Sequence, residues 1–137
     1  MNTGAEFREA VEAMDVEGMK ACLAEDVVFY SPVAFKGYHS KLVVSTLLEH
    51  VSQVFEDFKY VDEIEQGPSH MLRFRARVGE LEIEGVDLLD LGDDGLIKTF
   101  TVMVRPLKAA IALAQAMGAR IEAGGGVPQE PGTDSDS

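Results

Sequence analysis

One carboxylate in this 137-residue chain falls within an otherwise apolar row. Residues 81–91 alternate as a β-strand does, so Asp87 shares one face with Leu81, Ile83 and Leu89. A carboxylate on such a face loses water, and desolvation raises its pKa unless a partner compensates. A carboxyl group with a pKa near neutrality can serve as a general acid or base. The pattern therefore makes Asp87 the first candidate for a catalytic residue.

Two other interpretations of Asp87 stay open at this point. A bulge at Gly85 would turn the carboxylate out to solvent, and a hydrogen bond to a helix end would make its role structural. The tight turns on either side of the strand predict its cross-strand neighbours. These are Leu72 on one side and Phe100 on the other.

A histidine offers a partner for this acid. His50 lies on the apolar stripe of a predicted helix over residues 41–55, so it is expected to face the sheet and could form an acid–base pair with Asp87. The alternative is a core histidine that hydrogen-bonds a backbone carbonyl or a tyrosine. His70 is expected at the surface. The histidines are too scattered for a metal site, Cys22 is the single cysteine, and no cofactor motif occurs, so neither metal nor cofactor is expected.

The elements that must position these side chains follow from periodicity. Helices are expected over about residues 3–14, 15–23, 41–55 and 106–118, and strands over 27–30, 58–64, 71–78, 81–91 and 96–104. The expected helix N-caps are Thr3, Asp15 and Ser40, and Gly118 is a candidate C-cap. Helices segregated from an antiparallel meander indicate an α+β fold. A curved sheet around helix 41–55 would form a cone whose open end is a pocket.

Composition bounds the class of protein. Hydrophobic residues make up 46% of the chain, enough for the core of one domain, expected over residues 1–122. The remaining residues, 123–137, are rich in Gly, Pro, Ser and acids and predict a disordered tail. A net charge of −12 argues against nucleic-acid binding. Neither a transmembrane run nor a signal peptide is apparent, so a cytoplasmic location without membrane contact is expected.

A row of arginines follows the opposite face of the predicted strand 71–78. The tight turn at 79–80 sets Arg77 opposite Glu82 and Arg75 opposite Glu84. Such opposite charges predict an ion-pair ladder on an exposed or dimer-facing surface of the sheet.

Three segments carry a family resemblance that spans nearly all of residues 3–122. They are LAEDVVFYSPV at 23–33, EGVDLLDLGDDGLIKTFTVMV at 84–104 and RPLKAAIALAQAMGARIE at 105–122. With their order of elements, the chain resembles the nuclear transport factor 2-like (NTF2-like) superfamily in its SnoaL-like branch. The resemblance implies a cone-shaped fold, with N-terminal helices on the curved antiparallel sheet and a C-terminal helix. It also implies a homodimer formed through the sheet.

The resemblance also tests particular activities. The general-base aspartate of ketosteroid isomerases would fall at Ser31, and a serine of ordinary pKa cannot take a proton near neutrality. The acid–arginine–acid set of limonene-epoxide-hydrolase-like members would need an arginine at Gly85 and an acid near Met103. Polyketide cyclases of the SnoaL type use an acid in this strand region, which Asp87 could match. The resemblance also places Tyr30 and Ser31 beside the cavity.

These observations lead to alternative functional hypotheses. The first is an isomerase, cyclase or hydrolase that acts on an apolar or cyclic substrate by acid–base chemistry at Asp87, with help from His50. The others are a non-catalytic protein that binds a small hydrophobic ligand and a dimeric accessory domain with a filled core. The candidate ligand-binding residues are Tyr30, Ser31, Phe100 and Met103.

Overall fold

The structure is a computed structural model that describes residues 3–124. Its helices are α1 (Thr3–Glu12), α2 (Val16–Ala21), α3 (Lys41–Val54) and α4 (Leu107–Ala123). Its strands are β1 (Leu23–Tyr30), β2 (Tyr38–His39), β3 (Glu56–Gln66), β4 (Ser69–Val78), β5 (Leu81–Leu91) and β6 (Ile97–Arg105). The predicted α+β class is confirmed. The predicted tail from residue 125 onward lies outside the described residues.

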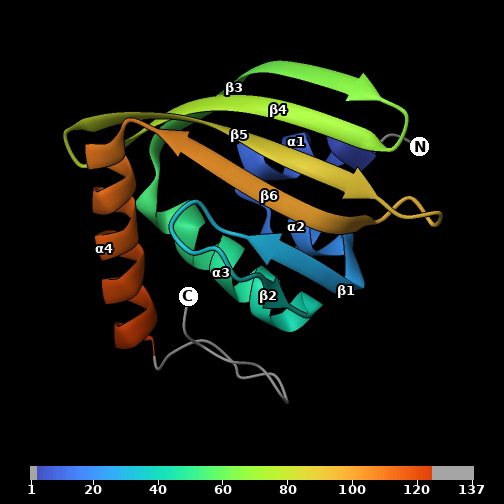
Figure 1. The fold of residues 1–137 in the computed structure, drawn as a ribbon, viewed down its shortest axis with the longest axis horizontal. Helices are drawn as coiled ribbons and strands as arrows, with labels where there is room; N and C mark the ends of the chain where they lie inside the picture. The colour runs from blue at the N-terminus through green and yellow to red at the C-terminus, as the bar shows by residue number, and fades with distance from the viewer. Residues whose placement is uncertain (1–2, 125–137) are drawn as a thin grey trace.

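A single curved sheet covers the three N-terminal helices, and α4 runs down one end of the molecule (Figure 1). The strand order is β2-β1-β6-β5-β4-β3. Strands β3 to β6 form the predicted antiparallel meander. Strand β1, however, pairs parallel to β6, so the sheet is mixed and the expectation of a wholly antiparallel sheet is wrong at that edge. Strand β1 adds to the free edge of β6 and runs in the same direction as β6.

The cross-strand neighbours of Asp87 follow the prediction on one side only. Leu72 lies opposite it on β4, as the two-residue turn required. On β6 the partner is Val102, and Phe100 lies opposite Leu89. The shift of two residues has a local cause. The backbone N–H of Gly92 donates to the Leu96 carbonyl at 2.8 Å, which shortens the loop to residues 93–95, and the ladder then slips once more between Asp90 and Leu91.

The predicted helix ends are partly confirmed. Asp15 caps α2 by accepting from the Gly18 amide, and Ser40 caps α3 by accepting from the Val43 amide. Thr3 is already inside α1, and its hydroxyl donates to the carbonyl of Gly95 at 2.5 Å. Gly118 does not end α4, which continues to Ala123 because the apolar pattern continues past the glycine.

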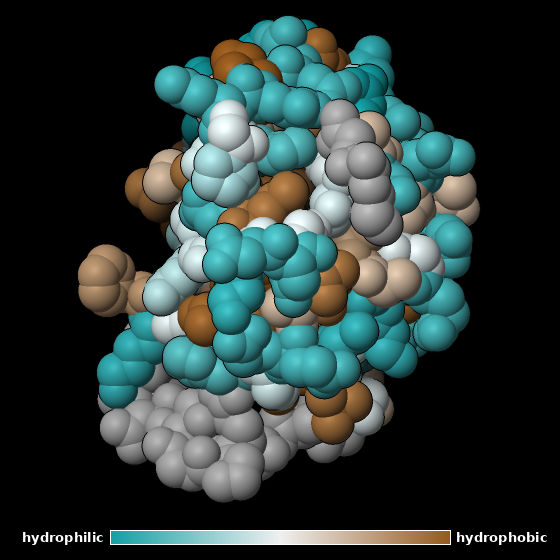
Figure 2. Space-filling model, turned by 90° about the vertical axis from the view of Figure 1, so that its right-hand side faces the viewer, coloured by the Kyte–Doolittle hydropathy of each residue, from teal (hydrophilic) through white to brown (hydrophobic). Residues whose placement is uncertain are grey.

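The core lies between the concave face of the sheet and the helices. Phe100 on β6 is buried between Phe7 of α1 and Phe29 of β1, with ring centroids 5.3 Å apart in both pairs. A second group under α4 contains Ile83, Ala109 and Leu113. At the end of the molecule that carries the β3–β4 and β5–β6 turns, the surface is mostly hydrophilic (Figure 2). Within residues 3–124, no helix is long and apolar enough to cross a membrane.

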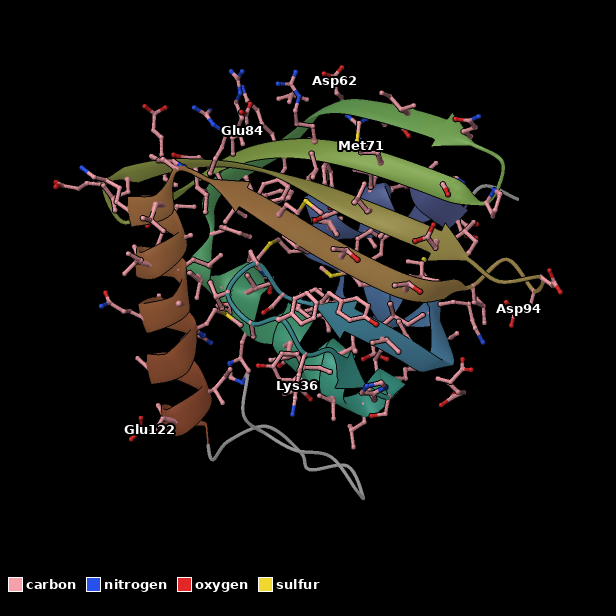
Figure 3. The ribbon with its side chains drawn as sticks, in the orientation of Figure 1. Lys36, Asp62, Met71, Glu84, Asp94 and Glu122 are labelled. Atoms are coloured by element: carbon pink, nitrogen blue, oxygen red, sulfur yellow. The ribbon has the colours of Figure 1, made fainter. Side chains whose placement is uncertain are left out.

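The convex face carries the predicted charge ladder. Asp62 and Glu84 project from the sheet on the side away from the helices (Figure 3). The register sets Arg77 opposite Glu82 and Arg75 opposite Glu84, as predicted. Glu84 pairs with the guanidinium of Arg75 at 3.2 Å and with that of Arg105 at 3.1 Å. Exposed pairs of this kind contribute little to the stability of the fold, because water and salt screen them.

A matched pair of glycine substitutions tests this packing. At Gly85 an added Cβ would lie 2.5 Å from Cζ of Phe74 and 2.6 Å from the carbonyl oxygen of Met103. Gly85→Ala is therefore expected to lower the free energy of unfolding by about 1–3 kcal/mol, because this region is closely packed. Gly118→Ala meets nothing within 4 Å in α4 and should raise it by roughly 0.5–1 kcal/mol. Urea unfolding measures both, and equal effects would contradict this packing.

Candidate active site

A cavity of about 440 Å³ lies between the concave face of the sheet and the helices. Its wall is largely apolar, with contributions from the sheet, α1, α3 and α4. The aromatic lining residues are Phe7, Phe29, Phe55, Phe58, Tyr38, Tyr60, Phe74 and Phe100. The exposed side chains of Met14 and Val33 belong to the lining and mark where the cavity reaches the surface. Its volume lies within the usual range for sites that take small molecules.

Asp87 lies in the wall of this cavity and is only 5% exposed. The residues that flank it on the concave face of β5, Gly85 and Leu89, are buried as well. The strand therefore keeps its regular alternation through Gly85, without the bulge that would have turned the carboxylate outward. The inward orientation that periodicity predicted is what the structure shows.

Tyr60 is the hydrogen-bond partner of this carboxylate. Its hydroxyl donates to Oδ2 of Asp87 over 2.6 Å, and the tyrosine is itself only 5% exposed. The pairing of β3 with β4 is irregular directly after Tyr60, between Tyr60 and Asp62. On its other side, the Tyr60 ring lies 5.9 Å from the guanidinium carbon of Arg8, which pairs with Glu63 at 2.7 Å. The tyrosine is thus held between the cavity and an ion pair at the surface.

The ionisation of the pair follows from its surroundings. Burial raises the pKa of Asp87 from its ordinary value of 3.8 to about 7, although the hydrogen bond from Tyr60 lowers it part of the way back. Burial, and then the neighbouring carboxylate, hold the pKa of Tyr60 well above its ordinary value. Tyr60 therefore stays a proton donor, while Asp87 changes its protonation state near neutral pH.

Two further hydroxyl groups line the cavity on the far side of β6 from Asp87. Tyr38 of β2 pairs with Phe29 of β1, and both line the cavity. Ser31 follows β1 and also lines it. The Ser31 Oγ accepts hydrogen bonds from the amides of Val33 at 3.4 Å and Ala34 at 3.1 Å. These contacts tie the loop after β1 to the serine that faces the cavity.

The structure brings three of the sequence-predicted residues to the cavity, namely Asp87, Ser31 and Phe100. Tyr30 is 37% exposed and Met103 is 55% exposed, and neither is part of the lining. Both alternate with inward-facing neighbours, so the strand period turns them to the convex face. The prediction that Tyr30 and Met103 contact a ligand in this cavity therefore does not agree with the structure.

Both histidines depart from the sequence expectation. His50 does not face the sheet or line the cavity; its ring lies against the end of α4, where a Cβ added to Gly124 would be 3.3 Å from the His50 Cε1. It therefore forms no pair with Asp87. His70 is buried rather than at the surface, because α1 covers it at Gly4. Within residues 3–124, no three His, Cys, Asp or Glu side chains are grouped to hold a metal ion.

Tyr60 is the functional candidate that sequence reasoning missed. It lies in the predicted strand 58–64, two residues after Phe58, so alternation could have placed it on the apolar face. What periodicity cannot show is that its hydroxyl reaches across β4 to a carboxylate on β5.

An NMR titration of the side-chain carboxyl carbons tests this geometry. The signal that is missing in Asp87→Asn belongs to Asp87, and its midpoint is expected at about pH 7. Tyr60→Phe should raise that midpoint further, because the lost hydrogen bond favours the charged form. A midpoint near the unperturbed value of about 3.9 would contradict the burial of this carboxylate in an apolar wall.

The comparisons with known proteins agree with the observed architecture. A crystal structure titled as a steroid delta-isomerase from Pseudomonas aeruginosa is 42% identical, with a TM-score of 0.85 over 88% of this chain and 90% of that one. A bacterial protein with a cystatin-like fold from Silicibacter pomeroyi is 41% identical, with a TM-score of 0.84 over 88% and 85%.

More distant structures show the same fold. An NTF2-like protein from Cytophaga hutchinsonii is 22% identical, with a TM-score of 0.62 over 76% of this chain and 88% of that one. No curated protein sequence gives a significant match. Residues 5–100 match the SnoaL-like domain. The chain therefore belongs to the SnoaL-like family and has the NTF2-like fold.

Proposed function

We propose that this protein is an enzyme that moves a proton on an apolar, cyclic ketone, with Asp87 as the general base and acid. The observation that carries the proposal is a buried carboxyl group, with a pKa of about 7, in the wall of an apolar cavity. A base of this strength is partly ionised at neutral pH and still binds a proton firmly enough to take one from carbon.

The proposed step needs no other reactant. The ionised carboxylate takes a proton from the carbon next to the carbonyl, and the electron pair of the C–H bond moves to give an enolate. Asp87, now neutral, returns the same proton to another carbon of the conjugated system, so the product is an isomer. Tyr60 donates to Oδ2 throughout, which holds the carboxyl group in place and limits the rise of its pKa.

The residues at the positions that a hydrolase or a different isomerase base would need favour proton transfer by Asp87. A hydrolase of the two-acid type would need an arginine at Gly85 and an acid near Met103. Gly85 is packed against Phe74, and Met103 lies on the convex face. Ser31, where the resemblance puts the isomerase base, accepts two backbone hydrogen bonds and cannot act as that base. Two other carboxylates in the described lining, Glu12 and Asp57, are exposed and paired with arginines, so Asp87 is the one suited to proton transfer.

The comparison with the protein titled a steroid delta-isomerase supports the same class, because moving a double bond requires such a proton transfer. A second candidate function, the binding of a hydrophobic ligand without chemistry, is favoured by the apolar cavity alone. It gives no reason for an acid in the wall, and the experiment below separates the two.

Deuterium exchange tests the proposal without knowledge of the natural substrate. The protein is expected to accelerate the exchange of the α-protons of 2-tetralone, a bicyclic ketone, in D₂O. The rate should rise with pH through about 7, because Asp87 acts as a base only after it loses its proton. Asp87→Asn should lower the rate by at least about 100-fold.

The matched control is Asp90→Asn, on the same strand, where the carboxylate is exposed and accepts from Ser69. It should leave the rate unchanged within about twofold. Isomerisation of a β,γ-unsaturated 3-ketosteroid, followed by ultraviolet absorbance, shows whether this protein also acts on a steroid, the substrate named for the similar protein from Pseudomonas aeruginosa. Exchange that Asp87→Asn leaves intact would overturn the proposal and favour a ligand-binding protein.

We further propose that two copies of the chain associate through the convex face of the sheet. The face exposes Ile64 and Met103 beside its charge ladder, so it offers apolar contact and both signs of charge to a second copy.

Light scattering at micromolar concentration tests this proposal and is expected to show a dimer. Met103→Glu should shift the dimer towards monomer, because it places a charge in the apolar contact. Leu42→Glu, at an exposed position on α3, should not. A monomeric wild-type protein would contradict the proposal.

A further inference from the structure

Asp87, Val102 and Ser31 form a row across the sheet side of the cavity, with the apolar residue between the two polar ones. Asp87 on β5 lies opposite Val102 on β6. On the other side of β6, Tyr30 pairs with Thr101 at the end of the ladder, and Ser31 and Val102 are the next residue of each segment. All three members of this row line the cavity. Since strands are about 4.8 Å apart, the Cα atoms of Asp87 and Ser31 are separated by about 10 Å.

The hydroxyl of Ser31 is prepared to donate rather than to accept. A serine oxygen has two lone pairs, and both are used by the amides of Val33 and Ala34. Its proton remains for a group in the cavity. An oxygen of a ligand that accepts a hydrogen bond would satisfy it.

The other end of the row is prepared differently. Oδ2 of Asp87 accepts from Tyr60, and within residues 3–124 this is the one hydrogen bond that the carboxylate makes. The second oxygen remains for the ligand. A carboxylate oxygen accepts a proton, whereas the Ser31 hydroxyl donates a hydrogen bond. The ligand therefore needs a proton to give at one end and an accepting oxygen at the other.

The charges around the cavity add a third requirement. The charged lining residues in the described part of the chain are Glu12, Asp57 and Asp87, and no Lys, Arg or His is among them. Glu12 pairs with Arg8, and Asp57 pairs with Arg77, but both arginines lie outside the lining. An anionic ligand would approach carboxylates without meeting a cation in the cavity.

We propose that Ser31 determines specificity, and that the cavity selects an uncharged, apolar ring compound whose carbonyl oxygen binds the Ser31 hydroxyl while a C–H group faces Asp87. This inference rests on the proposed function for the reaction at Asp87, and it names the substrate class: neutral ketones rather than carboxylates or sulfonates. Val102 lies beneath the ring system between the two ends.

Three fluorescent probes of similar size test the inference by titration. Prodan is a neutral naphthalene with a ketone, 2-(dimethylamino)naphthalene lacks that ketone, and 8-anilinonaphthalene-1-sulfonate is an anion. The wild type is expected to bind prodan more tightly than the other two. Ser31→Ala should weaken prodan binding roughly three- to tenfold and leave the probe without the ketone unchanged, because one hydrogen bond is lost.

Two variants distinguish the loss of the hydroxyl hydrogen bond from a change in the shape of the loop. Ser31→Thr keeps the hydroxyl group and is expected to restore prodan binding. Ser52→Ala is the matched control, since Ser52 lines the same cavity but donates its proton to the Glu49 carbonyl at 2.7 Å. It should change the binding of neither neutral probe. Circular dichroism confirms that each variant is folded.

The results distinguish this inference from the proposed function. Probe binding requires no proton transfer, so loss of the Asp87-dependent exchange with probe selection intact overturns only the enzyme assignment. Equal losses for both neutral probes in Ser31→Ala, no loss at all, failure of the wild type to bind prodan, or preference for the sulfonate would overturn the inference.

Discussion

The structure depends on one unfavourable placement, a carboxylate that the sheet buries in an apolar wall. Removing a carboxylate from water is costly, and a hydrogen bond from a neutral hydroxyl offsets part of that cost. Asp87 therefore changes its charge near neutral pH instead of at its ordinary value. This makes the cavity different from an ordinary gap in packing. Its wall holds a carboxyl group that is partly ionised at neutral pH.

Several features of the fold serve this placement. The regular ladder of β5 with β4 keeps Asp87 on the concave face, and Gly85 allows Phe74 to pack tightly beside it. Tyr60 reaches the carboxylate from β3 across the intervening strand. Helix α1 supplies Arg8, whose guanidinium lies near the tyrosine ring. The stability of the folded state thus also falls as the pH rises from about 4 towards 7, because the folded protein holds the Asp87 proton more firmly than the unfolded chain does.

The sequence predicted the features that rest on short-range rules. The period of two placed Asp87 inward, and the turn at Gly79, with φ of +62°, set Leu72 opposite it. It could not predict Val102 as the other neighbour, because that depends on an irregular turn and a slip in the ladder. The position of His50 depends on how α4 docks against α3, which no local pattern contains. Tyr60 was missed for a related reason: its inward direction is local, but its partner lies two strands away.

Both edge strands of the sheet have features that disfavour pairing with strands of other molecules. Unpaired edge strands are templates for aggregation, and short length or charge blunts them. The edge strand β2 has only two residues, and the other edge, β3, is long but carries the acids of the segment EDFKYVDEIEQ along an exposed backbone. An approaching strand would have to bring its own backbone against a row of carboxylates. Part of the net charge of −12 therefore protects the sheet's open side from unwanted extension.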